Sequence, residues 1–480
     1  MRELTTPSLA VSVVEQHASN KRLLIVEVPR NESSEPFAAT VSKRGGHRRA
    51  RRIGRQCHEM TTVAEMLEWA RSRSGYDWSA QPSGKPFESA RPATAALRDF
   101  LRESGEPERV SLAEETDRDL LARLQLLQPD SRLTRAGDVL LCPADAPRLR
   151  YTLRPVLGAR STASVRLSGR GLAKELRAVF DAFSSSNSTI SLPSGGLAEG
   201  AVQVLPFGAV REALVNAVMH RDWDRPEAIV IDHTEAELVV YSPGPFLDGV
   251  SERTVLTATS RTRNPRMGSV LRSLRIAERE RTGVDRMFIE LIRLGHKPPS
   301  FSERDAGVRV ALRGGPPVPE VLQVHASLPP PLRRSARSAV AIDLLRSKPS
   351  VSAEELGEVA QEAPKELAGF LADAVGAGLV QRTANPRRGG IPAWRLTDRH
   401  RETLGSVLPY YARPAEESAR LIAQLARSQG EVRNQDVQDL LGLSSPRASQ
   451  LLKRAEADGV IRLGPGAKRT GRGTFYVPTS

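Results

Sequence analysis

Arg447, Gln450 and Lys453 follow one another at intervals of three residues near the C-terminal end of the sequence. On a helix this interval gathers the three side chains on one side. Arginine, glutamine and lysine can read base edges in the major groove of DNA, which is wide enough to admit a helix. A glycine-rich loop with further cations follows and could grip the DNA backbone; its cations are Lys468, Arg469 and Arg472. The two clusters together predict contact with duplex DNA.

The elements expected to position these cations occupy residues 412–480, which we call the second C-terminal unit. An apolar face over 419–425 predicts its first helix. Asn434 is expected to cap the second helix, and Ser445 is expected to cap the third, with a tight turn at 442–444 between them. Two apolar strands, at 461–463 and 475–477, bracket the basic loop.

Residues 332–400, the first C-terminal unit, repeat this plan of three helices and two strands. Ser352 and Glu355 predict a capping box at the second helix, and Pro364 suits the start of the third. One face of that third helix is apolar, with Leu367, Phe370, Leu371, Ala374 and Val375. The tip between the two strands is basic and carries Arg387 and Arg388.

On these residues both units resemble the winged helix-turn-helix family, the second unit more closely. The resemblance implies that they bind double-stranded DNA through the third helix and the wing. Winged helices also serve as protein-docking modules and dimer interfaces. This alternative applies chiefly to the first unit, because phosphates would repel Glu366 and Asp373 on or beside its third helix.

Residues 211–223, Arg-Glu-Ala-Leu-Val-Asn-Ala-Val-Met-His-Arg-Asp-Trp, carry the most specific motif in the chain. Glu212, Asn216 and His220 recur every four residues, so a helix would present them on one face. The run resembles the N-box of GHKL-type ATPases, and most closely that of RecG-like or Schlafen-like predicted transcriptional regulators. Other segments that resemble this family follow in the correct order, and the likeness spans about 120–312; they are 133–141, 241–246, 260–265 and 281–284.

The resemblance implies a site for ATP and Mg²⁺. Asn216 would ligate magnesium through the nucleotide, and Glu212 would orient water in a member that hydrolyses ATP. The implied nucleotide-binding set is Asn216, His220, Ser242, Gly244, Arg263, Thr282 and Gly283. Two positions depart from the family pattern, since Ser242 replaces an acidic residue that recognises adenine and Arg281 replaces a loop glycine. The alternative is therefore a degenerate ATPase fold that acts as a relay or as the contact of a homodimer.

Residues 1–78 resemble the second half of an AlbA-type, Schlafen-like domain. The resemblance rests on a strand at 23–29, an Arg-Ile-Gly turn at 52–54 and Met-Thr-Thr at 60–62 before a helix at 63–70. The family's first half has no counterpart here, so nuclease activity does not carry over. A basic run could bind phosphates or could be a solvated loop; it contains Lys43, Arg44, Arg48, Arg49, Arg51, Arg52 and Arg55.

Composition bounds the remaining classes of function. An excess of 70 Lys and Arg over 56 Asp and Glu gives a net charge of +14, which attracts polyanions such as nucleic acids, although base bias in the genome would also enrich arginine. No apolar run reaches the ~20 residues that span a bilayer, and no signal peptide is evident, so we expect a cytoplasmic protein without a membrane partner. Cys57 and Cys142 lie far apart and the eight histidines are scattered, which predicts no zinc site. No G-x-x-x-x-G-K-[ST] loop supports helicase activity.

We therefore predict an α+β multidomain chain. It would contain a partial AlbA/Schlafen-like domain (1–78), a helical connecting segment (93–147), a GHKL-like α/β sandwich (148–314) and two winged helices (332–400 and 412–480). Polar residues at 79–92 and proline runs at 314–331 predict extended linkers. The predicted function is an ATP-responsive transcriptional regulator. The alternative is a weak GHKL-type ATPase that acts in DNA repair or defence.

Overall fold

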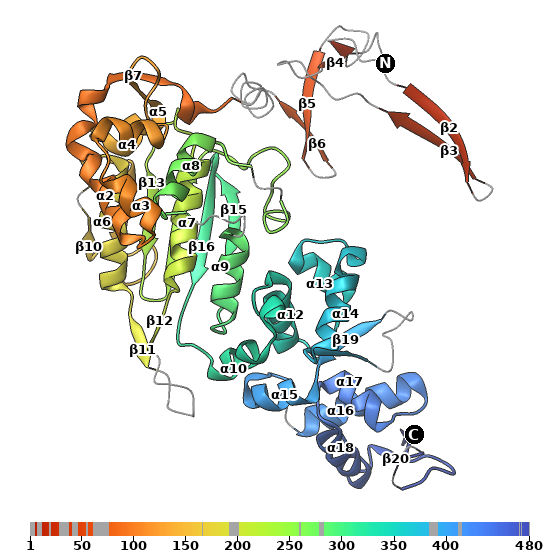
Figure 1. The fold of residues 1–480 in the computed structure, drawn as a ribbon. Coiled ribbons are helices and arrows are strands. Elements are labelled where there is room, and N and C mark those ends of the chain that lie inside the picture. Colours follow the sequence, from red (N-terminus) through yellow and green to blue (C-terminus); the bar gives the residue numbers. More distant parts are fainter. Residues whose placement is uncertain are drawn as a thin grey trace.

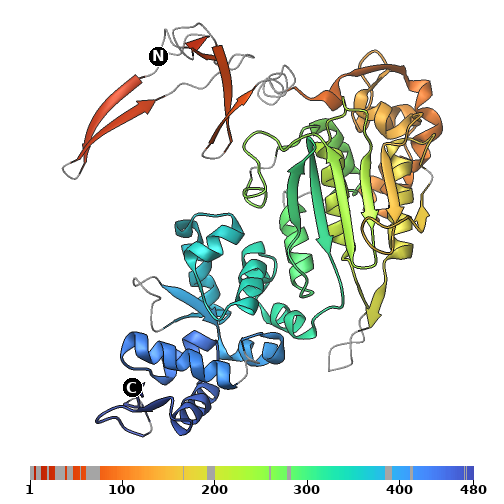
Figure 2. The same cartoon turned by 180° about the vertical axis from the view of Figure 1, so that it is seen from behind.

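The chain is a mixed α/β protein of several domains, seen here in a computed structural model (Figures 1 and 2). The structure describes residues 5–6, 12–18, 21–27, 38–40, 47–53, 56–60, 76–165, 167–191, 201–258, 261–277, 283–383, 392–410, 415–469, 471 and 473–479. Within these residues no helix is both long and apolar enough to cross a lipid bilayer.

The N-terminal part consists of short antiparallel strands. One sheet has the order β1–β4–β5–β6, and β2 pairs with β3 in a separate hairpin. Their bounds are Thr5–Thr6 (β1), Ser12–Ala18 (β2), Lys21–Glu27 (β3), Ala38–Thr40 (β4), His47–Ile53 (β5) and Gln56–Met60 (β6). β3 covers most of the strand predicted at 23–29. The predicted turn at Gly54 and the predicted helix at 63–70 lie outside the described residues.

The middle of the chain is built on a six-stranded sheet of order β10–β9–β13–β14–β16–β15. Only β9 and β13 pair in parallel; every other neighbouring pair is antiparallel. Helices α6, α7 and α9 pack beside this sheet, and α7 contacts β14 and α9 (Figure 1). The bounds are Leu149–Leu153 (β9), Ala163–Ser164 (β10), Leu172–Ser186 (α6), Phe207–His220 (α7), Ile229–His233 (β13), Glu237–Pro243 (β14), Pro265–Ser273 (α8), Gly283–Ile292 (α9), Ser300–Arg304 (β15) and Gly307–Arg313 (β16). A small hairpin joins Thr189–Ser191 (β11) to Ala201–Gln203 (β12).

The segment predicted as a linker at 79–92 folds against the sheet domain instead. Its strand β7 (Pro82–Pro86) pairs with β8 (Arg132–Thr134), and one continuous apolar core runs from Ala90 to Leu312. Three 3-10 turns lie in or beside this segment, at Trp78–Ala80 (η1), Phe87–Ser89 (η2) and Arg91–Ala93 (η3). The helices that follow it are Thr94–Glu103 (α2), Pro107–Ala113 (α3), Asp117–Arg123 (α4) and Arg135–Leu141 (α5). The polar composition of residues 79–92 suggested a linker, but strand pairing and burial against distant residues hold this segment in place.

The second predicted linker is also partly helical. α10 (Pro319–Ser327) and α11 (Pro330–Arg333) each begin at a proline. Proline is tolerated in the first turn of a helix, where its missing N–H would have no intrahelical acceptor. The predicted spacer is therefore partly replaced by helices that start at Pro319 and Pro330, whereas Pro316 and Pro317 lie outside the helices. Apolar residues of α9 and α10 share a second core with the first C-terminal unit.

Both C-terminal units contain three helices followed by a two-stranded hairpin. The first has Ala336–Ser347 (α12), Val351–Ser352 (β17), Ala353–Ala360 (α13), Pro364–Leu367 (η4), Ala368–Gly376 (α14), Val380–Arg382 (β18) and Ala393–Leu396 (β19). Asp398–Leu404 (α15) and the 3-10 turn Gly405–Val407 (η5) lead to the second unit, which has Ala415–Gln429 (α16), Asn434–Leu441 (α17), Ser445–Ala457 (α18), Ile461–Leu463 (β20) and Tyr476–Pro478 (β21). The capping box of Ser352 and Glu355 is confirmed.

Three local predictions in these units need correction. Asn434 does not cap α17; its side chain bonds Ser445 at the start of α18, because the two helices are closely packed. Ser445 is the first residue of α18 rather than its cap, a position that belongs to Ser444. Val375 is 43% exposed, so the apolar face of α14 ends one residue earlier than its spacing suggests.

Candidate functional sites

The cations predicted to read DNA lie on the exposed side of α18. Ala448, Leu452 and Ala455 are buried against the core of the second unit. Arg447, Gln450 and Lys453 are exposed. Among the described residues, neither a hydrogen bond nor an ion pair engages these three side chains. α18 therefore presents a polar, basic face to solvent.

A sharp turn sets the angle between α17 and α18. Gly442 ends α17 with a φ of 67°, a left-handed conformation that glycine adopts without strain. A Cβ atom at this position would lie 2.4 Å from the ring of Tyr410. Both the turn and the close approach of this ring require glycine here. The turn thus fixes α18 relative to the segment that joins the two units.

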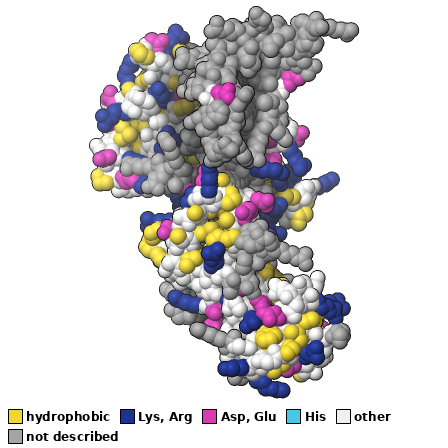
Figure 3. All heavy atoms as spheres, turned by 90° about the vertical axis from the view of Figure 1, so that its right-hand side faces the viewer, with side chains coloured by type: hydrophobic (Ala, Val, Ile, Leu, Met, Phe, Trp, Pro, Cys, Tyr) yellow, Lys and Arg dark blue, Asp and Glu magenta, His cyan; other side chains and the backbone are white. Residues whose placement is uncertain are grey.

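The loop between β20 and β21 lies after α18 and is also basic. Lys468 and Arg469 are exposed in it, whereas Arg472 lies outside the described residues. β21 also pairs with Val432 through an isolated bridge, so the hairpin is attached to the helical part of the unit. Figure 3 shows lysine and arginine side chains around the C-terminal end of the molecule, with an apolar patch between them.

The corresponding helix of the first unit has a different surface. Asp373 on α14 and the preceding Glu366 are exposed. The exposed positions of α14 within 368–376 are otherwise small or apolar, without a lysine or arginine. The predicted basic tip, with Arg387 and Arg388, lies outside the described residues.

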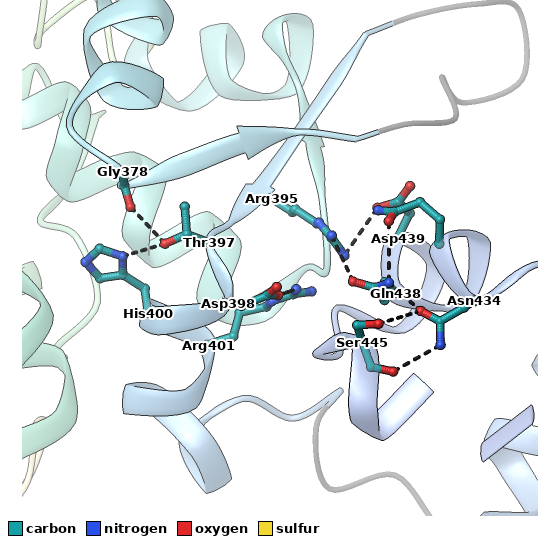
Figure 4. A network of polar contacts seen from close by, with 11 residues as sticks. Gly378, Arg395, Thr397, Asp398, His400, Arg401, Asn434, Gln438, Asp439 and Ser445 are labelled. Atoms are coloured by element: carbon teal, nitrogen blue, oxygen red, sulfur yellow. Dashed lines mark hydrogen bonds and ion pairs between the residues drawn. The ribbon is translucent and has the colours of Figure 1, made fainter. Parts of the chain in front are cut away.

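A buried polar network joins the two units (Figure 4). Arg395 on β19 is 1% exposed, and it donates to Gln438 at 3.2 Å and pairs with Asp439 at 3.3 Å, both on α17. Gln438 in turn donates to Asn434, whose side chain bonds Ser445 on α18. Sequence reasoning missed this network, because an arginine in a short strand is ordinarily expected to face water.

Of the three polar residues that recur every four positions along α7, two lie at a cavity. Asn216 and His220 on α7 line a cavity of about 120 Å³, together with Ser242 and Gly244. Glu212 is 3% exposed and does not line it. A Cβ atom on Gly283 would lie 2.6 Å from Glu212 Oε2, so the start of α9 covers this carboxylate closely. Thr282 and Arg281 lie outside the described residues.

Three polar residues near this cavity bind the chain's own backbone. The hydroxyl of Ser242 donates to the carbonyl of Ala217 at 2.8 Å. Arg263 donates to the carbonyls of His220 at 3.0 Å and Pro245 at 2.9 Å. Asn264, fully buried, donates through its amide to two carbonyls at the end of α7, those of Met219 (3.0 Å) and Arg221 (2.8 Å). Arg263 and Asn264, which belong to the segment 260–265 that resembles a family signature, thus hold the C-terminal end of α7.

The cavity is electrically neutral where it is described. Burial, and then the neighbouring Arg263 guanidinium, lower the pKa of His220 to about 4, so its imidazole is neutral at pH 7. The residues that line the cavity in the described part of the chain include no lysine, arginine, aspartate or glutamate. Among the described residues, no group of three or more His, Cys, Asp and Glu side chains is arranged to hold a metal ion.

The comparisons with known proteins agree with part of the prediction. Residues 227–312, from before β13 to the end of β16, match the family model described as "Putative ATP-dependent DNA helicase recG C-terminal". The chain is similar to a crystal structure of the DIP2311 protein from Corynebacterium diphtheriae, with 29% identity and a TM-score of 0.61 over 83% of this chain and 78% of that one. No curated protein matches the sequence. Residues 227–312 are therefore similar to an ATPase-like region of the RecG C-terminal type, and we call them the ATPase-like region.

Proposed function

We propose that this protein is a DNA-binding transcriptional regulator that reads duplex DNA through its second C-terminal unit. The observation that carries the proposal is the exposed face of α18 with Arg447, Gln450 and Lys453, next to the basic loop of Lys468 and Arg469. Three helices followed by a hairpin are the element order of a winged helix. In such a unit the third helix enters the major groove and the hairpin loop contacts the adjacent backbone.

The first C-terminal unit has a positioning role in this proposal. The carboxylates of Glu366 and Asp373 would meet DNA phosphates with repulsion, so α14 is unsuited to the groove. Arg395 of this unit is buried against α17 of the second unit, where its ion pair sets the direction in which α18 points. The first unit therefore connects the ATPase-like region to the DNA reader.

DNA binding by the whole chain of 480 residues tests this proposal directly. A pool of random duplexes is selected for binding, and the enriched sequence is titrated by fluorescence anisotropy between about 50 and 200 mM salt. We expect one enriched sequence and an affinity that falls steeply with salt, because counterions leave the phosphates that the cations neutralise. Absence of binding to any duplex at the lowest salt would overturn the proposal.

A second candidate is an ATPase that acts on DNA in repair or defence. It is favoured by the match of residues 227–312 to an ATPase-like family and by the position of Asn216, which could ligate magnesium on a bound nucleotide. The rest of the described site does not fit ATP, since Ser242 is bonded to Ala217 and no cation lines the cavity. Measurement of ATP turnover by the full chain, with and without DNA, separates the two candidates.

A further inference from the structure

The cavity beside α7 has apolar walls on several sides. The sheet contributes Val240, Val308 and Val310, and Phe301 lies on the edge strand. Helices contribute Ala217 and Val284, while the loop after β14 adds further apolar side chains, which are Phe246, Leu247, Val250 and Val255. A volume of about 120 Å³ is close to the ~150 Å³ of an apolar cavity that binds benzene. The enclosed space is therefore about the size of a single ring.

Few polar groups in this cavity are available to a ligand. The Ser242 hydroxyl already donates its proton to Ala217, and His220 is held neutral by burial. A ligand would therefore meet one carboxamide, that of Asn216, and one neutral imidazole. A charged ligand would lose its hydration without gaining an ion pair from the described walls, which is costly. The favoured ligand is uncharged and mainly apolar, with one or two hydrogen-bonding groups.

The loop that covers the cavity is also attached to the first C-terminal unit. Gln361, which ends α13, accepts a hydrogen bond from the backbone N–H of Leu256 at 2.7 Å. Its side-chain amide donates to the backbone carbonyl of Glu252 at 3.0 Å, and its backbone carbonyl accepts from the Thr257 hydroxyl at 3.0 Å. Leu256 packs against the core of that unit, whereas its neighbour Val255 lines the cavity. A displacement of this loop would therefore reach α13.

We propose that this cavity is an effector site for a small, uncharged, mainly apolar molecule about the size of one aromatic ring system. Occupancy is relayed to the first C-terminal unit through the loop at 244–258 and Gln361. Ligand occupancy would be the signal to which the proposed regulator responds, and in that respect the inference rests on the proposed function. Ligand binding and the movement of α13 are independent of DNA, so they are tested without it.

The first experiment measures binding of toluene and indole to the full-length protein by saturation-transfer NMR and thermal unfolding. Val250→Phe and Val255→Phe each fill the cavity from the loop, which limits damage to the sheet. Val156→Phe is the matched control, since Val156 is 64% exposed and does not line the cavity. We expect wild type and the control to bind both probes, and the two cavity variants to bind roughly tenfold or more weakly.

Two results would overturn the ligand assignment. One is equal probe binding by the wild type and by a folded Val250→Phe or Val255→Phe variant, with folding checked by circular dichroism. The other is tighter binding of ATP with Mg²⁺ than of either probe, with displacement of the probe by ATP. The second result would make the cavity a nucleotide site. Neither depends on whether the protein binds DNA.

The second experiment tests the relay by hydrogen–deuterium exchange with saturating indole. We expect slower exchange at 244–258 and at 353–361 in the wild type. Gln361→Gly removes the side-chain bonds without backbone strain, because Gln361 has a φ of 61° that glycine adopts readily. In this variant the change at 244–258 should persist and that at 353–361 should be smaller, because the Thr257 bond to the backbone carbonyl of residue 361 and the packing of Leu256 remain. No change at 353–361 in the wild type, or an undiminished change in Gln361→Gly, would refute the relay.

Discussion

Arg395 and Asp439 form an ion pair of 3.3 Å across the boundary between the two C-terminal units. Their side chains are 2% and 10% exposed, so water screens the pair little. Burial penalises the charged guanidinium and lowers the pKa of Arg395, while the carboxylate of Asp439 raises it. A buried ion pair contributes little net stability, but the loss of one partner leaves an uncompensated charge. The pair therefore favours one relative orientation of the two units.

Replacement of Asp439 by alanine should destabilise the C-terminal part strongly. The Arg395 charge would remain buried without its carboxylate, at a cost of about 3–5 kcal/mol. Denaturant unfolding measures the loss. The matched control is Glu431→Ala, which removes an exposed ion pair with Arg433 and should cost less than about 1 kcal/mol. If both variants lost the same free energy of unfolding, burial would not determine the contribution of the Arg395–Asp439 pair to stability.

Asn264→Ala should destabilise the ATPase-like region by about 1–3 kcal/mol. The carbonyl of Arg221 would lose its side-chain donor, and that of Met219 would keep only the backbone N–H of residue 264. The midpoint of chemical denaturation provides the measurement. Arg261→Ala serves as the control in the same segment, since Arg261 is exposed and donates to the carbonyl of Asp248. An Asn264→Ala variant no less stable than the control would exclude the capping role that we assign to Asn264.

The stability of the protein should fall as the pH is lowered from about 6.5 to 5. Burial lowers the pKa of His233, His296 and His325 to about 4, from 6.5. In this interval the unfolded chain binds protons that the folded chain does not, which favours unfolding. Buried carboxyls with raised pKa, such as Asp343, act in the opposite direction when they become protonated. Thermal scans at pH 7.5, 6.5, 5.5 and 5.0 test the expected fall, and a constant melting temperature would contradict it.

Local signals in the sequence were sufficient for several helices. The capping box of Ser352 and Glu355 is contained in four residues, and it is present in the structure. The four-residue spacing of Glu212, Asn216 and His220 likewise indicated a helix, found as α7. Such features need only neighbouring residues to form, since the side chains and the backbone groups that they satisfy belong to the same turn.

Contacts between distant residues could not be predicted in this way. Trp78 stacks on Trp223 with ring centroids 6.2 Å apart and donates to Asp224 at 2.7 Å. These contacts hold the chain against the sheet domain directly before the segment predicted as a linker. The burial of Arg395 depends on a partner from another unit. The cavity is likewise formed by α7, the sheet and the loop after β14 together. The polar spacing on α7 alone could not indicate that most of its walls are apolar.

Arg447 and the basic loop should affect DNA binding in different ways. If Arg447 reads a guanine, Arg447→Ala should reduce discrimination between the selected sequence and a single mismatch by about 1–3 kcal/mol. Lys468→Ala and Arg469→Ala should weaken binding to every duplex alike, and each should lower the salt slope by about 1 because one phosphate contact is lost. Anisotropy titrations at several salt concentrations, on matched and mismatched duplexes, separate these effects. The assignment of α18 as the reading helix would fail if Arg447→Ala changed only the salt slope and left discrimination intact.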